Sequence, residues 1–466
     1  MIFINRSAEL EFLNQAWESD RAELQILYGR RRVGKTELLK KFASDKRQVQ
    51  FVATQSSREQ QLRAFAIAVR QGLGMDAQGV SFEDWESAFR FIFSRSAKEK
   101  LVVVLDEFPY LVQADSSLPS VLQACWDQFL RDSQALLLLS GSSISFMESD
   151  VLGHASPLFG RRTGQYLLNP MTPTEARLFH PELCADEQVQ TFAVLGGMPA
   201  YLQQFDSKLD FWTNIERKIL QKGAFLHEEV PFLLMQELRE PRLYLAILTA
   251  IAEGHTRLNE IAQRALGPTQ LNRASFYLQT LQNLRLVERR VPVTEFAEHK
   301  SRKGIYRICD PFVRFWMRFV HQESSALEMG DRGQVLQRIQ ENWSDFVAPV
   351  FEDICRESMV SQALSSRLPF RPWRVGSWWG PHGEIDLVVI DASKTKVLLG
   401  ECKWSINPTG PDTLQQLQRN SHQLARELGN PDLEMHYALF SRSGFSDNLK
   451  QRAGEVLLLT PEDLYA

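Results

Sequence analysis

The sequence predicts an α/β fold in several domains, with a parallel-sheet domain of the P-loop type first and a second α/β domain last. Three observations predict it. An apolar strand at residues 24–28 leads through a glycine-bounded loop into a helix at 37–42. Two more apolar runs, 101–105 and 135–139, are typical of strands buried on both faces. Helix and strand patterns alternate again from residue 341 onward.

The length and composition of the chain limit the number of domains and the class of protein to be considered. The 466 residues exceed what one core serves, and their number suggests about three domains. The net charge of −4 does not decide whether the chain binds nucleic acid, so charge must be considered segment by segment. Five scattered cysteines without a CxxC pair suggest a reducing compartment. No signal peptide and no membrane-length apolar run is visible, so we expect a soluble, cytoplasmic protein.

The loop after the first strand matches the P-loop pattern, Gly29-x4-Gly34-Lys35-Thr36. In such loops, backbone N–H groups and the helix N-terminus surround the phosphates. The lysine reaches the outer phosphates, and the threonine hydroxyl binds Mg²⁺. We therefore predict a nucleoside triphosphate site formed by Gly29, Arg30, Arg31, Arg32, Val33, Gly34, Lys35, Thr36 and Glu37.

Acidic and hydroxyl side chains follow the two buried strands. Asp106 and Glu107 end the first, where open α/β sheets hold their ligands. Asp106 is expected to bind Mg²⁺ and Glu107 to orient the attacking water. The run Ser140–Ser143 ends the strand expected beside the P-loop strand. Its hydroxyls either contact the γ-phosphate and its water or cap the next helix.

Two arginines stand in a glycine-flanked loop before another strand, Arg161 and Arg162. An arginine placed against the γ-phosphate accelerates hydrolysis by orders of magnitude. The other interpretation is a solvated basic turn.

At this point the first 205 residues resemble P-loop ATPases of the AAA+/STAND kind, specifically the archaeal ATPase type also found in bacteria. The motif Asn5-Arg6-x-x-Glu9-Leu10 resembles the one that flanks the base, and Gly196–Leu202 resembles the GxP motif near the adenine. The resemblance implies ATP as the nucleotide, with Arg6 and Pro199 beside it. It implies an arginine finger at Arg161 or Arg162, on its own site or a neighbour's.

Residues 206–310 are expected to form a helical lid, broken at Pro231 and Pro241, and then a winged helix-turn-helix. Two amphipathic helices, 255–266 and 275–284, flank a Gly-Pro turn and precede a hairpin start. Residues 255–307 carry ten Lys or Arg and four Asp or Glu, a net charge of +6. DNA backbone binding is one interpretation, with Gln270, Asn272 and Arg273 facing a groove. The other is a lid packed on the ATPase.

In the last domain, acidic side chains are expected to lie opposite one another on two neighbouring strands. If Ala392–Thr395 is the turn between two strands, Asp386 lies opposite Glu401, and Glu384 opposite Lys403, all on one face. Facing carboxylates destabilise a sheet unless a cation separates them, and Mg²⁺ or Mn²⁺ suits oxygen ligands. A lysine beside that metal is able to position or deprotonate a water that attacks phosphate.

The expected order, one helix at 343–359, three strands, a helix and a strand, resembles the core of PD-(D/E)xK nucleases. The resemblance implies that Asp386, Glu401 and Lys403 are the catalytic triad, with Glu352 as an accessory metal ligand. Ile385 stands where the family often has proline. An inactive nuclease fold, used for DNA binding or dimerisation, is the alternative.

Together these features predict four parts: an ATPase domain (1–205), a lid and winged helix (206–310), a connecting segment (311–340) and a nuclease-like domain (341–466). The predicted function is ATP hydrolysis that is coupled, on DNA, to a metal-dependent nuclease-like domain. The alternative is an ATP-dependent signalling switch whose winged helix and inactive nuclease fold are interaction modules. ATP and DNA are the expected partners, together with a second copy of the chain or another protein.

Overall fold

The computed structural model describes residues 3–75, 80–96, 99–360, 368, 370–381, 383–430, 432–452 and 454–465. They form two compact units. The first runs to Pro170 and includes Met198–Ala200, and the second comprises Met171–Gly197 and the chain from Tyr201 onward. The division into four parts stays a prediction, and each unit is described by itself.

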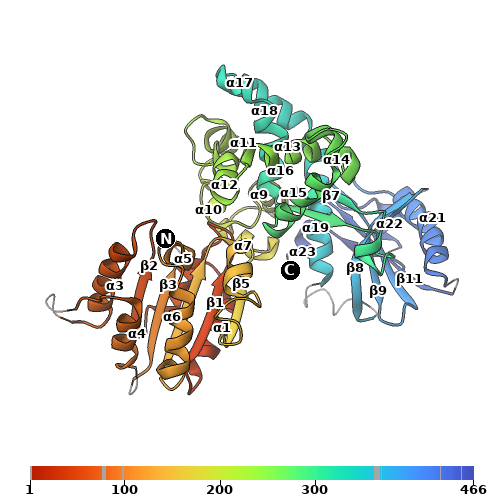
Figure 1. Cartoon of the computed structure of the whole chain (residues 1–466). Helices are drawn as coiled ribbons and strands as arrows, with labels where there is room; N and C mark the ends of the chain where they lie inside the picture. The colour runs from red at the N-terminus through yellow and green to blue at the C-terminus, as the bar shows by residue number, and fades with distance from the viewer. Residues whose placement is uncertain are drawn as a thin grey trace. The chain divides into compact units, whose positions relative to one another are not determined.

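The first unit is a parallel sheet with helices packed against it (Figure 1). Its strand order is β2-β3-β4-β1-β5. The strand at 135–141 lies beside the P-loop strand, as expected, and separates it from the strand that ends in Asp106. Because all five strands run in the same direction, the motifs at their carboxyl ends meet at one edge.

The sheet forms the centre of this unit, because three of its five strands, β1, β3 and β4, are buried along their whole length. Its strands are β1 Glu23–Tyr28, β2 Gln48–Val52, β3 Leu101–Asp106, β4 Ala135–Gly141 and β5 Gly164–Leu167. Its helices are α1 Ser7–Glu18, α2 Lys35–Ala43, α3 Arg58–Gly72, α4 Trp85–Phe93, α5 Phe108–Ala114, α6 Leu118–Cys125, η1 Trp126–Leu130, α7 Ile144–Phe146 and η2 Met147–Val151.

The second unit begins with helices. They are α8 Pro173–Ala176, η3 Arg177–Phe179, α9 Ala185–Leu195, α11 Phe211–Ile215, η4 Glu216–Leu220, α12 Glu229–Glu237 and α13 Pro241–Ala252. The short helix α10 Pro199–Leu202 begins with two residues of the first unit, Pro199 and Ala200. The expected break at Pro241 is present, because α12 ends at Glu237 and α13 begins at Pro241. The expected break at Pro231 is wrong, because Pro231 lies in the first turn of α12. Early helical positions accept proline because their N–H groups have no partner inside the helix.

Two helices and a two-stranded antiparallel sheet follow, at the residues where helix, turn, helix and hairpin were expected. They are α14 Leu258–Ala265, α15 Leu271–Asn283, β6 Val287–Arg290 and β7 Ile305–Ile308, with η5 Glu298–Lys300 in the loop of the hairpin. The second helix starts four residues earlier than expected, so Asn272 and Arg273 lie in its first turn. Both side chains are exposed. The winged-helix description itself stays a prediction.

A mixed five-stranded sheet of order β12-β11-β10-β9-β8 forms the end of the chain. Before it come α16 Pro311–Phe315, η6 Trp316–His321, α17 Ser324–Glu328, α18 Arg332–Glu341 and α19 Trp343–Val360. The sheet and its helices are β8 Pro372–Gly380, β9 Gly383–Asp391, β10 Lys396–Lys403, α21 Pro411–Leu428, β11 Glu434–Ser441, α22 Asp447–Lys450, β12 Leu457–Leu459 and α23 Pro461–Leu464. The predicted order of helix, three strands, helix and strand is therefore present. The chain as a whole is α/β, as predicted.

Among the described helices, none combines the length and the apolar character needed to cross a membrane.

Candidate functional site

The P-loop connects β1 to α2 and is shaped by one glycine. Gly34, with φ +98°, precedes the first residue of α2 in a left-handed conformation that a side chain would strain. Lys35 is 5% exposed, and its Nζ donates to the carbonyls of Gly29 (2.8 Å) and Arg30 (3.0 Å). These bonds hold the ammonium against the loop whose N–H groups are expected to bind phosphate.

The magnesium-binding pair predicted from the sequence is brought together by the sheet. The Thr36 hydroxyl donates to Asp106 Oδ2 at 2.7 Å, although 70 residues separate them. Asp106 is 2% exposed. Hydroxyl and carboxylate oxygens are ligands that Mg²⁺ accepts, so this pair fits the ion. Here two strands that are not neighbours, β1 and β3, contribute to one site.

Glu107 is positioned by Ser142, which follows β4, the strand between β1 and β3. Its φ of 55° is left-handed, an uncommon conformation for a glutamate. Its Oε2 accepts hydrogen bonds from Ser142 Oγ (2.7 Å) and Ser142 N (3.3 Å). Of the four hydroxyl and glycine positions 140–143, Ser142 is therefore the one that meets the acid. Ser143 precedes α7 without a side-chain capping bond, so the capping alternative is wrong for that residue.

Arg6 and Pro199 lie beside the P-loop. Arg6 is 4% exposed and donates to Glu9 Oε1 (2.9 Å), the Asn169 carbonyl (2.9 Å) and the Val33 carbonyl (3.0 Å). The guanidinium thus holds the loop against the N-terminal helix. Pro199 Cγ would lie 3.8 Å from a Cβ placed on Gly34. Both positions agree with the expected neighbourhood of the nucleotide.

The remaining loop side chains point to protein partners. Arg30 is 3% exposed. Arg31 donates to the Tyr110 hydroxyl, and Glu37 pairs with Lys40 at 3.0 Å. Arg32 has a φ of 68°, a second left-handed position within the loop. Their assignment to the nucleotide stays a prediction.

Arg161 and Arg162 lie at the opposite edge of the sheet from the P-loop. The next residue, Thr163, donates its N–H to the Leu24 carbonyl at 2.8 Å, level with the start of β1. The P-loop follows the other end of β1, six residues on. At ~3.3 Å per residue the separation is roughly 20 Å, well beyond the length of an arginine side chain. An arginine finger acting on the chain's own nucleotide is therefore wrong.

Local contacts hold both arginines at that edge. Arg161 pairs with Asp127 at 2.9 Å, and the Arg162 guanidinium lies 5.3 Å from the centre of the Phe159 ring. Action on the nucleotide of a neighbouring copy stays a prediction.

In the C-terminal sheet, the predicted register is confirmed. Residues 397–400 of β10 pair with 390–387 of β9, and the turn between the strands is 392–395. Next to this ladder, the Cys402 N–H is bonded to a side chain of β9: it donates to Asp386 Oδ2 at 2.9 Å. Lys403 Nζ pairs with Glu401 Oε1 at 2.7 Å. The predicted side chains therefore gather at one end of the two strands.

The carboxyl groups in this cluster interact. Burial, and next the charge of Asp386, raises the pKa of Glu352 to about 8. The same two causes raise the pKa of Glu401 to about 7, against the opposing effect of Lys403. The pKa of Asp386 is also raised, mainly by burial. Neighbouring carboxyl groups raise one another's pKa because their negative charges repel. A divalent cation bound between them would relieve this repulsion.

The metal-binding geometry is nevertheless incomplete. Within the described ranges, no three His, Cys, Asp or Glu side chains come together closely enough to hold an ion. The donor set of carboxylates fits Mg²⁺ or Mn²⁺ in chemistry, and the ion's place among Glu352, Asp386 and Glu401 stays a prediction.

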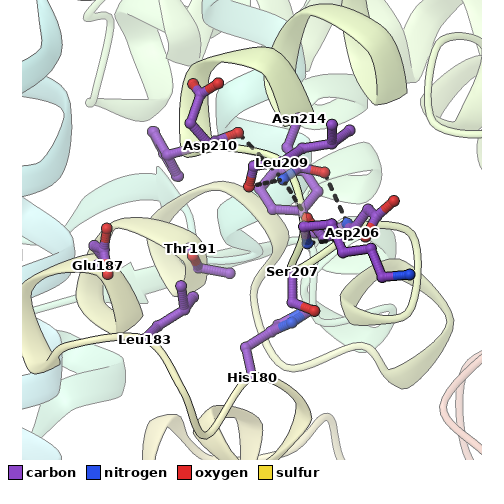
Figure 2. A pocket seen from close by; sticks show the side chains of 12 residues that line it. His180, Leu183, Glu187, Thr191, Asp206, Ser207, Leu209, Asp210 and Asn214 are labelled. Carbon is purple, nitrogen blue, oxygen red and sulfur yellow. Dashed lines mark hydrogen bonds between the residues drawn. The ribbon is translucent and has the colours of Figure 1, made fainter.

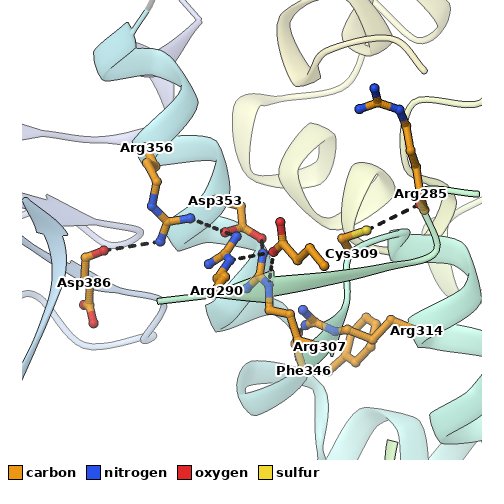
Figure 3. A network of polar contacts seen from close by, with 10 residues as sticks. Arg285, Arg290, Arg307, Cys309, Arg314, Phe346, Asp353, Arg356 and Asp386 are labelled. Carbon is orange, nitrogen blue, oxygen red and sulfur yellow. Dashed lines mark hydrogen bonds and ion pairs between the residues drawn. The ribbon is translucent and has the colours of Figure 1, made fainter. Parts of the chain in front are cut away.

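A network of ion pairs that the sequence analysis missed links the hairpin to this cluster (Figure 3). Asp353 accepts from Arg290 (2.7 Å), Arg356 (2.6 Å) and Arg307, and Arg356 also donates to the Asp386 carbonyl at 3.3 Å. Burial alone would raise the pKa of Asp353, but the three guanidinium groups outweigh it and hold that pKa well below its usual range. Arg356 lies three residues after Asp353 on α19, whereas Arg290 and Arg307 come from β6 and β7, so no local pattern marks those two partners.

The same network changes the interpretation of the basic segment 255–307. Arg290 and Arg307 also bind Glu288, both at 2.5 Å. Other counted cations are bonded within the unit as well. Arg264 pairs with Glu253 (2.6 Å), Lys303 with Glu427 (2.6 Å), and Arg289 donates to main-chain carbonyls. Arg273 donates to the Tyr277 hydroxyl at 3.2 Å, so at least six of the ten basic residues are bonded within the unit.

A separate pocket of about 270 Å³ lies in the second unit (Figure 2). Figure 2 shows His180, Glu187 and Thr191 on one side and residues 206–214 on the other. The Asn214 amide donates to the carbonyls of Asp206 (2.9 Å), Leu209 (3.2 Å) and Asp210 (3.3 Å). That wall is therefore held by its own hydrogen bonds, and none of the predicted site residues lines the pocket.

Two family models match the chain. One describes an ATPase domain predominantly from Archaea and matches residues 3–205. The other describes archaeal and bacterial proteins of unknown function and matches residues 316–415, a range that contains Glu352, Asp386, Glu401 and Lys403.

Two relatives come from Methanocaldococcus jannaschii. The uncharacterized protein MJECL04 is 31% identical over 462 residues, which cover 99% of this chain and all of that protein. The uncharacterized ATP-binding protein MJ0423 is 57% identical over 47 residues, 10% of this chain and 80% of that protein.

Among solved structures, the Walker-type ATPase PABY2304 of Pyrococcus abyssi is similar, with a TM-score of 0.52 and 20% identity over 68% of this chain and 96% of that one. At this identity the likeness shows the fold. Together with the match to residues 3–205, it shows that the chain carries a P-loop ATPase domain.

Proposed function

This chain belongs to the family of the Methanocaldococcus jannaschii protein MJECL04, and from that premise we propose that it binds and hydrolyses ATP with Mg²⁺. The main support for this proposal is the hydrogen bond from the Thr36 hydroxyl to Asp106 Oδ2, at 2.7 Å. Lys35 and Glu107 are the residues next to this pair in the sequence. Bound Mg²⁺ neutralises charge that develops on the phosphates. Thr36 and Asp106 would hold the ion, Lys35 would bind the outer phosphates, and Glu107 would orient water.

The direct test is ATP turnover by the full chain and by Lys35→Ala, with and without Mg²⁺. We expect Mg²⁺-dependent turnover by the wild type that Lys35→Ala loses, together with weaker nucleotide binding. If the wild type turns over no faster than the variant, it binds nucleotide without hydrolysing it, and the enzyme proposal is wrong.

We propose further that ATP turnover is coupled to DNA through the C-terminal domain. Asp386, Glu401 and Lys403 at one end of β9 and β10, with Glu352 from α19, support a metal-dependent nuclease-like site. Lys403, which pairs with Glu401 at 2.7 Å, would position a water near the carboxylates.

Cleavage of supercoiled and single-stranded DNA with Mn²⁺, by the wild type and by Lys403→Ala, tests the second proposal. We expect cleavage by the wild type only. Equal cleavage by both proteins, or by neither, removes the nuclease assignment.

A second candidate is an ATP-dependent switch in which the C-terminal domain is an interaction module. Two observations favour it: at least six of the ten basic residues at 255–307 are bonded internally, and no ready-made metal cluster is found among the described residues. DNA-stimulated ATPase activity with a steep salt dependence supports the first function. ATPase activity that is indifferent to DNA supports the switch.

A further inference from the structure

We infer that the second unit carries a binding site for single-stranded nucleic acid, formed by Phe296, Trp373, Arg374 and Lys394. We call this group the Trp373 platform. It shares the loop of the β6–β7 hairpin, is formed by residues other than those of the carboxylate cluster, and does not depend on ATP turnover.

Three distant segments build the platform. Phe296 lies in the loop between β6 and β7, Trp373 and Arg374 lie at the start of β8, and Lys394 lies in the turn between β9 and β10. The rings of Phe296 and Trp373 are 5.9 Å apart between centres and inclined by 31°. Lys394 Nζ is 3.8 Å from the centre of the Phe296 ring and 5.8 Å from that of Trp373. An ammonium beside two tilted rings is thus present at one surface.

The two rings are exposed, although the hairpin loop and β8 are joined by a buried contact. Trp373 is 52% and Phe296 43% exposed. The seam between the loop and β8 is made by Val293 instead, which is 2% exposed and donates its N–H to the Ser377 carbonyl at 2.8 Å. A backbone hydrogen bond therefore joins the loop to β8 in addition to the contact between the two rings.

The two cations of the platform, Arg374 and Lys394, have different roles. Arg374 binds Glu298 at 2.5 Å and the Glu295 carbonyl at 3.1 Å, so it fastens the loop to β8. Lys394 has no ion-pair partner within the part of the chain that the structure describes. It stands at φ 58° in its turn, a left-handed position where glycine or asparagine is usual. A lysine kept in that conformation supplies a charge that the turn itself does not need.

This chemistry suits an unpaired strand. Bases stack on exposed aromatic faces without regard to sequence, and cations beside them bind the phosphates. Lys300 and Arg302, both exposed on the loop that carries Phe296, add positive charge. A duplex conceals its bases and offers the rings nothing to stack on.

The test is binding of fluorescent 15-mer oligo(dT) and oligo(U) by the full chain, without ATP and at low salt. We expect Trp373→Ala to weaken binding about tenfold, the effect of losing one stacked base. Lys394→Gly is expected to weaken it as well while leaving the thermal midpoint unchanged or higher, because glycine accepts the left-handed turn. The tighter of the two oligomers identifies the kind of strand.

The matched control is Phe232→Ala, which removes a ring that is 51% exposed on α12 and should leave binding of the oligomers unchanged. Wild-type affinity in both Trp373→Ala and Lys394→Gly overturns the inference. So does an equal loss in Phe232→Ala, or polyglutamate binding that is as tight as oligomer binding and equally reduced in Trp373→Ala. Because no nucleotide is present, the outcome is independent of the proposed ATPase activity.

Discussion

Glu107 stands in a left-handed conformation with its carboxylate bound by Ser142, at 2.7 Å from the hydroxyl. Uncommon backbone conformations of this kind persist only where the surrounding structure holds them, and they cluster at active sites. Lys35 and Arg6 are likewise held by carbonyl groups of the P-loop. The charged residues of this site are thus oriented by the protein.

Replacement of Glu107 separates binding from hydrolysis. Glu107→Gln keeps the shape of the side chain but cannot act as a base, so we expect turnover to fall at least about 100-fold. The Kd for ATP should stay within a few-fold of the wild type. Ser142→Ala, which removes only the hydroxyl that holds the acid, should lose less. Normal turnover by Glu107→Gln would contradict its assigned role.

The carboxylate cluster predicts a pH dependence of stability. The pKa values of Glu352 and Glu401 are raised to about 8 and about 7, so the folded protein keeps protons that the unfolded chain releases above about 4.3. Their stabilising contribution is complete below that pH and is lost as the pH rises through the folded values. We expect the thermal midpoint, measured with EDTA, to fall between pH 5 and pH 8.

Two comparisons check this explanation. Glu352→Gln should reduce the fall in midpoint, because one of the coupled acids is gone. Mn²⁺ or Mg²⁺ should raise the midpoint more at pH 8 than at pH 5, because ionised carboxylates bind the cation. An identical pH profile for the wild type and Glu352→Gln contradicts the role of the cluster.

At the scale of elements, α15 shows why counting charges is insufficient. Its first turn exposes Asn272 and Arg273, and Arg273 donates to the Tyr277 hydroxyl at 3.2 Å. Arg264 on the neighbouring helix α14 is instead paired with the Glu253 carboxylate through two nitrogens, at 2.6 and 2.8 Å. A paired guanidinium must break its ion pair before it binds phosphate. The DNA-binding capacity of this module therefore depends on a few positions.

Arg273→Ala is expected to weaken binding of duplex DNA and to reduce the slope of log affinity against log salt by about 1. Arg264→Ala is the matched control, since it removes the same charge from the same module, and it should change both quantities less. Affinity titrations at several salt concentrations measure the two. Equal losses in the two variants would show a diffuse charge effect and no contact by α15.

At the scale of the whole molecule, the two edges of the first sheet have different roles. The carboxyl edge holds the predicted ATP site, and Arg161 and Arg162 lie at the amino edge, level with Leu24. If either arginine assists hydrolysis, the nucleotide belongs to another copy of the chain. Activity then depends on association between copies.

Mixing variants tests this dependence. Lys35→Ala lacks the nucleotide site and keeps the arginines, and the double variant Arg161→Ala/Arg162→Ala has the reverse defect. We expect each alone to be nearly inactive and the mixture to regain activity that rises with protein concentration. Full activity of the double variant shows that neither arginine is catalytic.

Much of the architecture was predictable because its signals are local. The P-loop, the apolar strands that end in Asp106 and in Ser140–Ser143, and the register of β9 with β10 follow from spacing and alternation over a few residues. The α/β class and the ATPase domain are accordingly confirmed by the fold and by the family match. The roles of Asp386, Glu401 and Lys403 stay predictions, because their chemistry depends on an ion.

Only the tertiary structure decided which partners distant side chains meet. Ser142 rather than Ser140 reaches Glu107, Arg161 and Arg162 lie away from their own P-loop, and Asp353 gathers three arginines. The Trp373 platform likewise joins three segments. Contacts between residues far apart in the chain leave no periodic pattern in the sequence, since they depend on how whole elements pack. The sequence alone determined the elements and the motifs at their ends, and packing determined which charges remained available for function.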